Sequence, residues 1–278
     1  MKNLEKYYRF LLIFVRYPFI MNLNYGLRRR CWLGEVIAVL SGKGGTGKTS
    51  VCAGVATALA EEGKKLLCID CDVGLRNLDI SLGLSDCGGL SFLDVASGNY
   101  PLEQAAVHPL YPGLSFLTAP MNCPVESISQ AEFEAMLRKA RQVFDYILLD
   151  APAGVDAGFR LAAQAADRFV LVTGAGPAAV RDASRVGDIL ELMGKRDVRL
   201  VVNRVDRDVL QTVRITIDDV MDEAGLPLLG VVLEDPYVVL AASFGQPLLK
   251  YARRCDAAKA YRKIAKRIQG FHAPITLR

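Results

Sequence analysis

The chain has 278 residues, of which 51% are hydrophobic and 23% are charged, and its formal net charge is +4 at pH 7. This composition is typical of a globular chain rather than a disordered one, and we expect one folded domain. The seven cysteines are odd in number and lack zinc-finger spacing, which argues against a disulfide framework and favours a reduced, cytosolic setting.

The small net charge conceals an uneven distribution. Residues 1–33 carry seven Lys or Arg and one acid, and residues 250–278 carry nine and one, whereas residues 34–249 carry 18 basic and 28 acidic residues. A chain that is basic throughout is typical of nucleic-acid binding, but this chain is basic only at its ends. The pattern indicates that those ends contact an anionic surface, either lipid headgroups or DNA phosphate.

The first 33 residues differ from the rest of the chain. Residues 10–15 are apolar, but Arg16 and Pro18 interrupt the run, so it is too short and too broken to span a bilayer. It also lacks the small-residue cleavage site of a signal peptide. Either translation begins near Met21, the interpretation we favour, or residues 1–33 form a basic, aromatic arm that associates with a membrane.

An apolar stretch over residues 36–40 leads into Gly-Lys-Gly-Gly-Thr-Gly-Lys-Thr at residues 42–49. Every position of the phosphate-binding pattern GxxxxGK[ST] is present. The glycines let backbone N–H groups point at a polyphosphate, Lys48 neutralises its terminal phosphates, and Thr49 offers a hydroxyl to Mg²⁺. The helix that begins near Ser50 adds its positive dipole end. We predict a nucleoside triphosphate with Mg²⁺, bound by Gly42, Gly44, Gly45, Thr46, Gly47, Lys48, Thr49 and Ser50.

From residue 35 onward, apolar runs of strand length alternate with amphipathic or alanine-rich stretches of helix length. This alternation predicts a single-domain α/β fold of the P-loop NTPase class, a mostly parallel sheet with helices on both faces. The domain is expected over residues 34–270, with a short tail at residues 271–278. The predicted strands are residues 36–40, 66–70, 114–117, 146–150, 169–173, 200–203 and 229–233, and the predicted helices are residues 50–62, 129–143, 159–166, 180–193, 217–224 and 256–269.

Acidic residues follow two of these strands, at the sheet edge where the phosphate-binding loop also lies. Asp70 and Asp150 each end a strand, and Asp72 follows two residues after the first of them. A carboxylate in this place can hold Mg²⁺ through water or orient the attacking water, although an acidic strand end is also common as a solvated turn. Thr49, Asp70 and Asp150 are the candidate magnesium ligands.

Two further strand ends carry candidate contacts to a nucleotide base. Asn203 ends the strand at residues 200–203, and its amide can read the edge of adenine. Asp235 and Pro236 follow the next strand in a similar place. Asparagine at a strand end is also a frequent turn former, so both interpretations stay open.

The loop contains a second lysine, Lys43, in addition to Lys48. A phosphate-binding loop does not need this second lysine to bind the nucleotide of its own subunit. With it, the loop resembles the deviant Walker A motif, KGGxGKT, of the MinD and ParA ATPases. The resemblance implies an ATP-bound homodimer in which Lys43 reaches the partner's nucleotide, as an arginine finger does. It makes Lys43, Lys48 and Asp72 the catalytic residues, with Asp72 activating water.

Further segments carry the same resemblance. The run Asp-Cys-Asp-Val-Gly-Leu-Arg-Asn-Leu-Asp at residues 70–79 resembles the first switch segment of the MinD branch, with Asn77 in a supporting role, and Asp-Ala-Pro-Ala-Gly at residues 150–154 resembles the second switch. The resemblance implies that the Gly154 N–H approaches the γ-phosphate, and that Asn203 recognises adenine.

The resemblance is to the MinD branch over about residues 34–268. It includes residues 173–186, which resemble the segment of that branch leading into the helix where partners bind. The implied partners are a MinC-like septation inhibitor, contacted by Arg181 and Asp182, and a MinE-like or scaffold regulator. Ser184 departs from the second acid that is common there.

The implied function is division-site placement by an ATPase that dimerises with ATP and is reset by hydrolysis. Such a protein is cytoplasmic and peripherally associated with the inner face of the cell membrane through anionic lipid. The alternative is a ParA-like ATPase that binds DNA non-specifically for chromosome or plasmid partition. Residues 257–271 form either the last core helix with a solvated basic face or a basic helix that docks on lipid.

Overall fold

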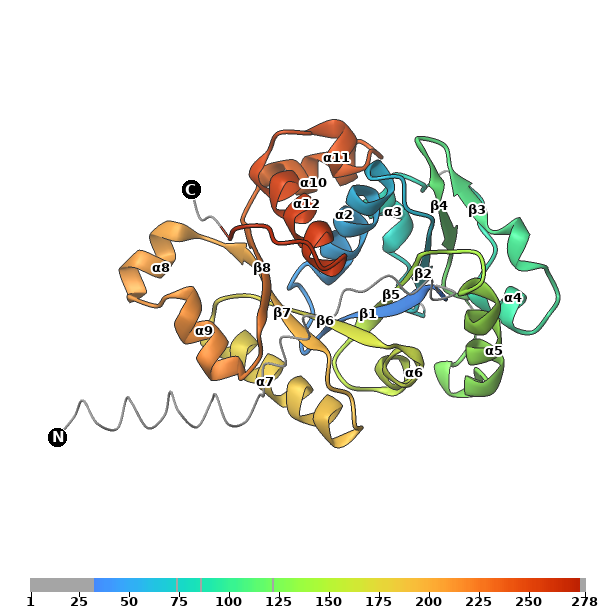
Figure 1. Ribbon diagram of the computed structural model, residues 1–278, viewed down its shortest axis with the longest axis horizontal. Helices are drawn as coiled ribbons and strands as arrows, with labels where there is room; N and C mark the ends of the chain where they lie inside the picture. Colours follow the sequence, from blue (N-terminus) through green and yellow to red (C-terminus); the bar gives the residue numbers. More distant parts are fainter. Residues whose placement is uncertain (1–32, 74, 86, 122, 276–278) are drawn as a thin grey trace, which may run out of the picture. The chain divides into compact units, whose positions relative to one another are not determined.

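The computed structural model describes residues 33–73, 75–85, 87–121 and 123–275. In this part of the chain, eight strands form one sheet in the order β3-β4-β2-β5-β1-β6-β7-β8 (Figure 1). Neighbouring strands are parallel, except that β3 and β4 are antiparallel. The strands are β1 (Glu35–Ser41), β2 (Leu66–Asp70), β3 (Ala106–His108), β4 (Tyr111–Leu117), β5 (Tyr146–Ala153), β6 (Arg168–Thr173), β7 (Val198–Val205) and β8 (Leu228–Leu233).

Helices cover both faces of the sheet, and the alternation along β1 shows why. Val36, Ala38 and Leu40 point into a core shared with α5, α6, α7 and α9, whereas Ile37 and Val39 point into a second core shared with α2, α3, α11 and α12 (Figure 1). The helices are α2 (Lys48–Glu61), α3 (Leu78–Leu82), α4 (Phe92–Ala96), α5 (Gln130–Ala140), α6 (Ala157–Ala165), α7 (Pro177–Leu192), α8 (Arg207–Val213), α9 (Ile217–Ala224), α10 (Pro236–Ser243), α11 (Leu248–Tyr251) and α12 (Asp256–Ile268).

The predicted fold class is confirmed, and every predicted strand and helix is present with small shifts at its ends. The sequence pattern did not predict β3 or the helices α3, α4, α8, α10 and α11. Each of these elements has eight residues or fewer, which is too short to show a clear period. Of the predicted N-terminal extension, only Leu33 lies within the described residues.

The last helix, α12, is part of the core. Tyr261, Ile264 and Ile268 are buried against α2 and β8. A Cβ on Gly54 of α2 would overlap the Tyr261 ring, so the glycine permits this close packing. The apolar face of α12 is therefore already buried against the rest of the domain. This confirms the interpretation of α12 as the last core helix. None of the described helices combines the length and hydropathy that a bilayer crossing requires.

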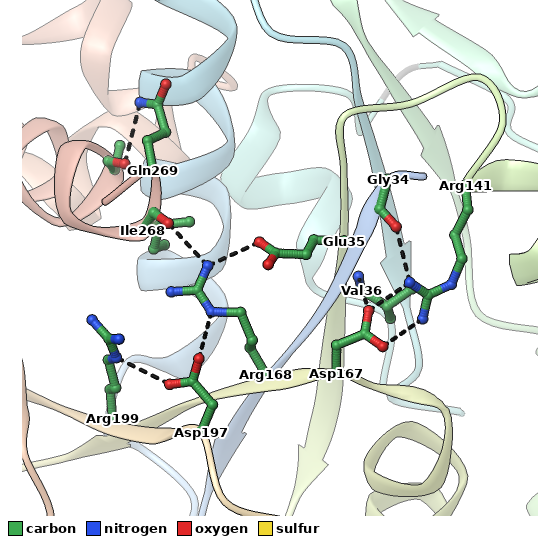
Figure 2. Close-up of polar contacts among 11 residues, drawn as sticks. Gly34, Glu35, Val36, Arg141, Asp167, Arg168, Asp197, Arg199, Ile268 and Gln269 are labelled. Carbon is green, nitrogen blue, oxygen red and sulfur yellow. Dashed lines mark hydrogen bonds and ion pairs between the residues drawn. The ribbon is translucent and has the colours of Figure 1, made fainter. Parts of the chain in front are cut away.

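Two ionic networks close the amino ends of the strands (Figure 2). In the first, Arg141 Nη1 and Nη2 donate to Asp167 Oδ2 and Oδ1 at 2.5 and 2.9 Å, and Nη1 also donates to the Gly34 carbonyl oxygen at 2.9 Å. Asp167 Oδ2 in turn accepts the Val36 N–H at 2.9 Å. This network joins the segment after α5 to the starts of β1 and β6.

The second network is centred on Arg168 at the start of β6. Its Nη1 donates to Glu35 Oε2 and to the Ile268 carbonyl oxygen, both at 2.9 Å, and its Nε donates to Asp197 Oδ2 at 2.9 Å (Figure 2). Arg199 Nε donates to the other Asp197 oxygen at 3.0 Å. Burial lowers the pKa of Arg168, but the neighbouring acids outweigh burial and leave that pKa raised.

Candidate nucleotide-binding site

The loop of residues 42–47 joins β1 to α2 at the carboxyl end of the sheet. Gly45 and Gly47 have φ values of 79° and 81°, a left-handed conformation that glycine adopts without strain. Gly47 is the N-cap residue of α2 and supplies no side-chain cap. The first backbone N–H groups of α2 are therefore left for a ligand, as anion sites at helix N-termini require.

The first glycine of the loop lies against another helix. A Cβ on Gly42 would come within 2.7 Å of the Asp182 carbonyl oxygen and 2.8 Å of its Cβ. Such distances are shorter than van der Waals contact, so only glycine fits there. The loop is thereby packed directly against α7, the helix that carries the predicted partner residues.

Lys48 and Asp150 form a buried ion pair at the mouth of the loop. Lys48 Nζ lies 2.5 Å from Asp150 Oδ1, and the two residues are 6% and 1% exposed. Burial lowers the pKa of the Lys48 ammonium, but the attraction and hydrogen bond of Asp150 outweigh it, so that pKa is raised. Lys48 Nζ is also 3.5 Å from Thr49 Oγ1. The predicted lysine, hydroxyl and strand-end carboxylate therefore lie together.

Two hydroxyl groups beside the loop are buried without a hydrogen-bond partner in the described part of the chain. They are Ser41 Oγ at the end of β1 and Thr46 Oγ1 in the loop. Leaving a buried hydroxyl unpaired costs about 1–3 kcal/mol. These groups, the uncapped N–H groups of α2 and the Lys48 ammonium are the donor set that a polyphosphate would satisfy, so the residues fit the predicted ligand.

The Asp70 carboxylate holds the loop that follows β2. Its Oδ1 accepts the Asp72 N–H at 2.9 Å, and its Oδ2 accepts the N–H groups of Asn77 and Leu78 at 3.1 Å each. Asp70 lies opposite Asp150 in the register of β2 and β5. Burial, followed by the Asp150 charge, raises the pKa of Asp70 to about 6 despite these hydrogen bonds.

Asp72 is half-buried on the same loop and belongs to the same electrostatic group. Burial raises the pKa of its carboxyl, Lys48 lowers it and Asp150 raises it, with a net increase. The Asp72 carbonyl oxygen accepts the N–H groups of Leu75 and Arg76 at 3.3 Å each. The candidate for water activation is thus held in a folded turn, and the charge of Lys48 acts on its carboxyl.

Gly154, at the end of β5, has φ 89° and donates its N–H to the Ser41 carbonyl oxygen at 3.0 Å. The N–H predicted to approach the γ-phosphate is therefore bonded to the strand that leads into the loop. The register of β1 and β5 also shifts between Val39 and Ser41. The hydrogen bond between Gly154 and Ser41 lies just beyond this shift. It links the carboxyl ends of β1 and β5, where the phosphates are expected.

Asn203 is buried at the end of β7, and its Nδ2 donates to the Thr46 carbonyl oxygen at 2.8 Å. The bond leaves its Oδ1 as an acceptor for an amino group such as that of adenine. The next residue, Arg204, is left-handed, with φ 55°. Its Nη1 donates to the Gly45 carbonyl oxygen at 3.0 Å, and its Nε and Nη2 donate to Glu234 at 2.8 and 3.2 Å.

Asp235 and Pro236 lie where β8 turns into α10. Asp235 Oδ1 accepts the Tyr237 N–H at 3.0 Å and caps α10, while its Oδ2 accepts the Ala257 N–H at 3.0 Å near the start of α12. Pro236 is exposed in the first turn of α10. These contacts give Asp235 a role in fixing two helix starts, and its predicted contact with adenine stays a prediction.

The remaining predicted residues lie at the edge of this group. Lys43 and Gly44 are exposed at the tip of the loop, Ser50 is half-buried in the first turn of α2, and Arg181 is exposed on α7. Lys43 makes no ion pair within the described residues, which suits a side chain that reaches outward. The sequence pattern did not predict a role for Ser41 or the contact of Arg204 with the loop. Ser41 precedes Gly42 and Arg204 follows Asn203, so each is next to a predicted site residue.

Comparison with known proteins shows the family to which this chain belongs. Residues 37–248 match the family described as the CobQ/CobB/MinD/ParA nucleotide binding domain. The chain is 35% identical over 244 residues to the septum site-determining protein MinD of Synechocystis, covering 87% of this chain and 92% of the relative.

Solved structures of MinD proteins also resemble this chain. A chain of the MinC:MinD cell division protein complex of Aquifex aeolicus aligns with a TM-score of 0.80 and 34% identity, covering 87% of this chain and 98% of that chain. The septum site-determining protein MinD of Pyrococcus horikoshii, complexed with Mg-ADP, aligns at 0.75 and 29%, covering 84% and 96%. A ParA family ATPase of Chlorobium tepidum aligns at 0.74, covering 83% and 98%, but at 21% identity it shows the fold alone.

Proposed function

Because this chain belongs to the CobQ/CobB/MinD/ParA nucleotide-binding family, in its MinD branch, we propose that it is an Mg²⁺-dependent ATPase of division-site placement. The observation that carries the chemistry is the buried Lys48–Asp150 pair, which lies beside the hydroxyls of Ser41 and Thr46 that lack hydrogen-bond partners within the described residues. A ParA-like role in DNA partition is less supported, because the likeness to the ParA structure extends to the fold only.

The residues divide the work of phosphoryl transfer. With a nucleotide bound, Lys48 would pair with the terminal phosphates instead of Asp150, and Thr49, Asp70 and Asp150 would hold Mg²⁺. The metal, when bound, neutralises charge that develops on the phosphate oxygens. Asp72 orients the attacking water. Release of the γ-phosphate contacts then relaxes the loops that follow β2 and β5, which makes the nucleotide a switch.

Dimerisation with ATP is the next part of the proposal, and the exposed Lys43 at the tip of the loop supports it. We propose that two subunits face each other across their nucleotides and that each Lys43 reaches the partner's phosphates. A cation supplied in this way contributes about 10³-fold or more to turnover. The test is light scattering with ATP under conditions that block hydrolysis, together with ATPase assays of Lys43→Ala. A chain that stays monomeric, or a variant with full turnover, would overturn this proposal.

A MinC-type inhibitor is the proposed partner of α7, supported by the complex in which the Aquifex relative was solved. Arg181 is exposed on α7 and Asp182 is half-buried beside Gly42. Arg181→Glu should reduce binding of a MinC-type protein without changing basal ATPase activity, measured by pull-down and phosphate release. Unchanged binding would contradict this assignment. A MinE-like or scaffold regulator that stimulates hydrolysis is proposed for the same helix.

The ATP-bound dimer is proposed to associate with the inner face of the cell membrane. The motivation is the family's role at the division site and the basic residues that end the chain. Flotation with vesicles that contain anionic lipid should recover more protein with ATP than with ADP. Equal recovery with the two nucleotides would contradict the nucleotide switch.

A further inference from the structure

The helix α10 exposes apolar side chains that the core does not use. Tyr237, Val239, Leu240 and Phe244 are 47%, 66%, 41% and 63% exposed. Ala241 of the same helix is buried, and it lies with Gly54 of α2 and Tyr261 of α12 around one small pocket between helices. A surface helix of a globular protein normally places polar residues on its outer side. An exposed apolar cluster of this kind marks a surface that binds something.

Basic residues follow this cluster, and acidic residues are missing from it. Between Pro236 and Arg254 the chain contains no Asp or Glu, whereas the domain before residue 250 is acidic overall. Lys250, Arg253 and Arg254 are exposed, and none pairs with an acid in the part of the chain that the structure describes. The segment is therefore cationic as well as apolar.

A ring contact joins the apolar and basic parts. Phe244, just after α10, stacks on Tyr251 at the end of α11, with ring centroids 5.6 Å apart and planes at 16°. Lys250 precedes Tyr251 in the chain, and Arg253 and Arg254 follow it closely. Packing between α10 and α11 holds these residues on one part of the molecule (Figure 1).

We propose that this α10–α11 surface binds anionic lipid headgroups and acyl chains. It consists of the exposed side chains of Tyr237, Val239, Leu240, Phe244, Lys250, Arg253 and Arg254. The inference rests on the proposed membrane association and names the part of the chain that carries it out. Apolar side chains enter the boundary of the acyl region while lysine and arginine stay at the phosphates, which is how interfacial helices bind.

Charge complementarity favours lipid over a second copy of this chain. Two copies that meet through the α10–α11 surface would bring cations against cations, whereas an anionic membrane meets each cation with a phosphate. The helix α12 offers no alternative anchor, because its apolar side chains are buried in the core. The surface also lies on the α2 and α12 side of the sheet, opposite α7. Lipid and a partner on α7 can therefore bind at the same time.

The test is vesicle flotation of the full chain with ATP, using mixed phosphatidylglycerol and phosphatidylcholine vesicles against phosphatidylcholine alone. Leu240→Gln/Phe244→Gln should lower partition into anionic vesicles by about tenfold or more, because two apolar groups no longer enter the lipid. The matched control is Val209→Gln/Val213→Gln on α8, where both valines are more than half exposed. The control should bind as the unaltered chain does. ATPase activity should stay unchanged in both variants.

Lys250→Gln/Arg254→Gln sharpens the test, since it should abolish the preference for anionic over neutral vesicles. If the unaltered chain fails to bind anionic vesicles, both the membrane association and this inference are overturned. If it binds and the α10 variant binds equally well, only the α10–α11 surface is overturned. Loss of ATP-dependent dimerisation in the α10 variant, measured by light scattering, would also overturn the inference, because the surface would then be an interface between copies.

Discussion

The two ends of the sheet use charged residues in opposite ways. At the amino end, Arg168 has two acids and a carbonyl oxygen as partners. At the carboxyl end, Lys48 and Asp150 are buried together, and the hydroxyls of Ser41 and Thr46 have no partner within the described residues. At the amino ends of these parallel strands the polar groups have hydrogen-bond partners, whereas at the carboxyl ends two buried hydroxyls lack them within the described residues.

This difference separates stability from function. Polar groups that are partnered at a surface contribute modestly to stability and need nothing further. Buried groups that lack partners or repel one another cost stability, and proteins retain them where a ligand uses them. Because strand ends gather loops at the carboxyl edge of a parallel sheet, the costly groups are collected there. Substitutions at the two ends should consequently have different effects.

The largest effect is expected at the carboxyl end. Lys48→Ala should lower ATP turnover by about 10²-fold to 10³-fold or more, measured by phosphate release. It should also lower the free energy of unfolding by about 3–5 kcal/mol, because the Asp150 carboxylate stays buried without its cation. Lys48→Ala/Asp150→Ala should recover most of that stability but none of the turnover. A double variant as unstable as the single one would show that the pair does not carry the effect.

The pH dependence of stability tests the same end. The pKa of Asp70 is raised from its ordinary value of 3.8 to about 6, so the folded state binds a proton more readily than the unfolded state in this range. The contribution of Asp70 to the free energy of unfolding therefore falls as the pH rises from 3.8 to about 6, and it is lowest above about pH 6. The total change is on the order of 2–3 kcal/mol. Asp70→Asn cannot titrate and should lack this slope, measured by urea unfolding at several pH values. Parallel profiles for the two proteins would contradict the shift.

At the amino end, the expected effect is on stability alone. Arg168→Ala should lower the free energy of unfolding by about 2 kcal/mol, because Asp197, Glu35 and the Ile268 carbonyl oxygen lose a common partner. Arg199→Ala, which removes one exposed contact to Asp197, should cost less than about 1 kcal/mol. Turnover of the folded protein should be unchanged in both. A clear drop in turnover for Arg168→Ala would break the separation between the two ends.

The smallest effect is expected for Arg204, which touches the phosphate-binding loop from outside. Its side chain is largely exposed, so Arg204→Ala should change stability by less than about 1 kcal/mol. Losing the bond to the Gly45 carbonyl oxygen should loosen the loop and raise KM for ATP about fivefold, equivalent to about 1 kcal/mol, with kcat nearly unchanged. Arg207→Ala on the neighbouring helix serves as the control. A fall in kcat without a change in KM would contradict a positioning role.

The sequence predicted the sheet and the phosphate-binding loop because both have local signatures. Apolar runs such as residues 146–150 identify buried parallel strands, and the spacing of Gly42, Gly47 and Lys48 is a motif in itself. The carboxylates Asp70 and Asp150 could be placed beside the loop because strand ends share one edge of the sheet.

Contacts between distant residues could not be predicted in this way. Asn203 and Thr46 are 157 positions apart, and Arg204 and Gly45 are 159 apart, so only the folded chain brings them together. The helix α10 was missed for a different reason. It is apolar on all sides over eight residues, and such a segment shows neither the period of a strand nor that of an amphipathic helix.

The contact between Gly42 and the backbone of Asp182 has a consequence for regulation. Since the two touch without space for a methyl group, a displacement of α7 toward the loop by a fraction of an ångström has to push the phosphate-binding loop. A regulator seated on α7 would in this way act by mechanical pressure, which counter-ions do not weaken as they weaken charge. High salt should accordingly leave unchanged the increase in ATP hydrolysis that each bound regulator causes, even where salt lowers the affinity of the regulator for the protein.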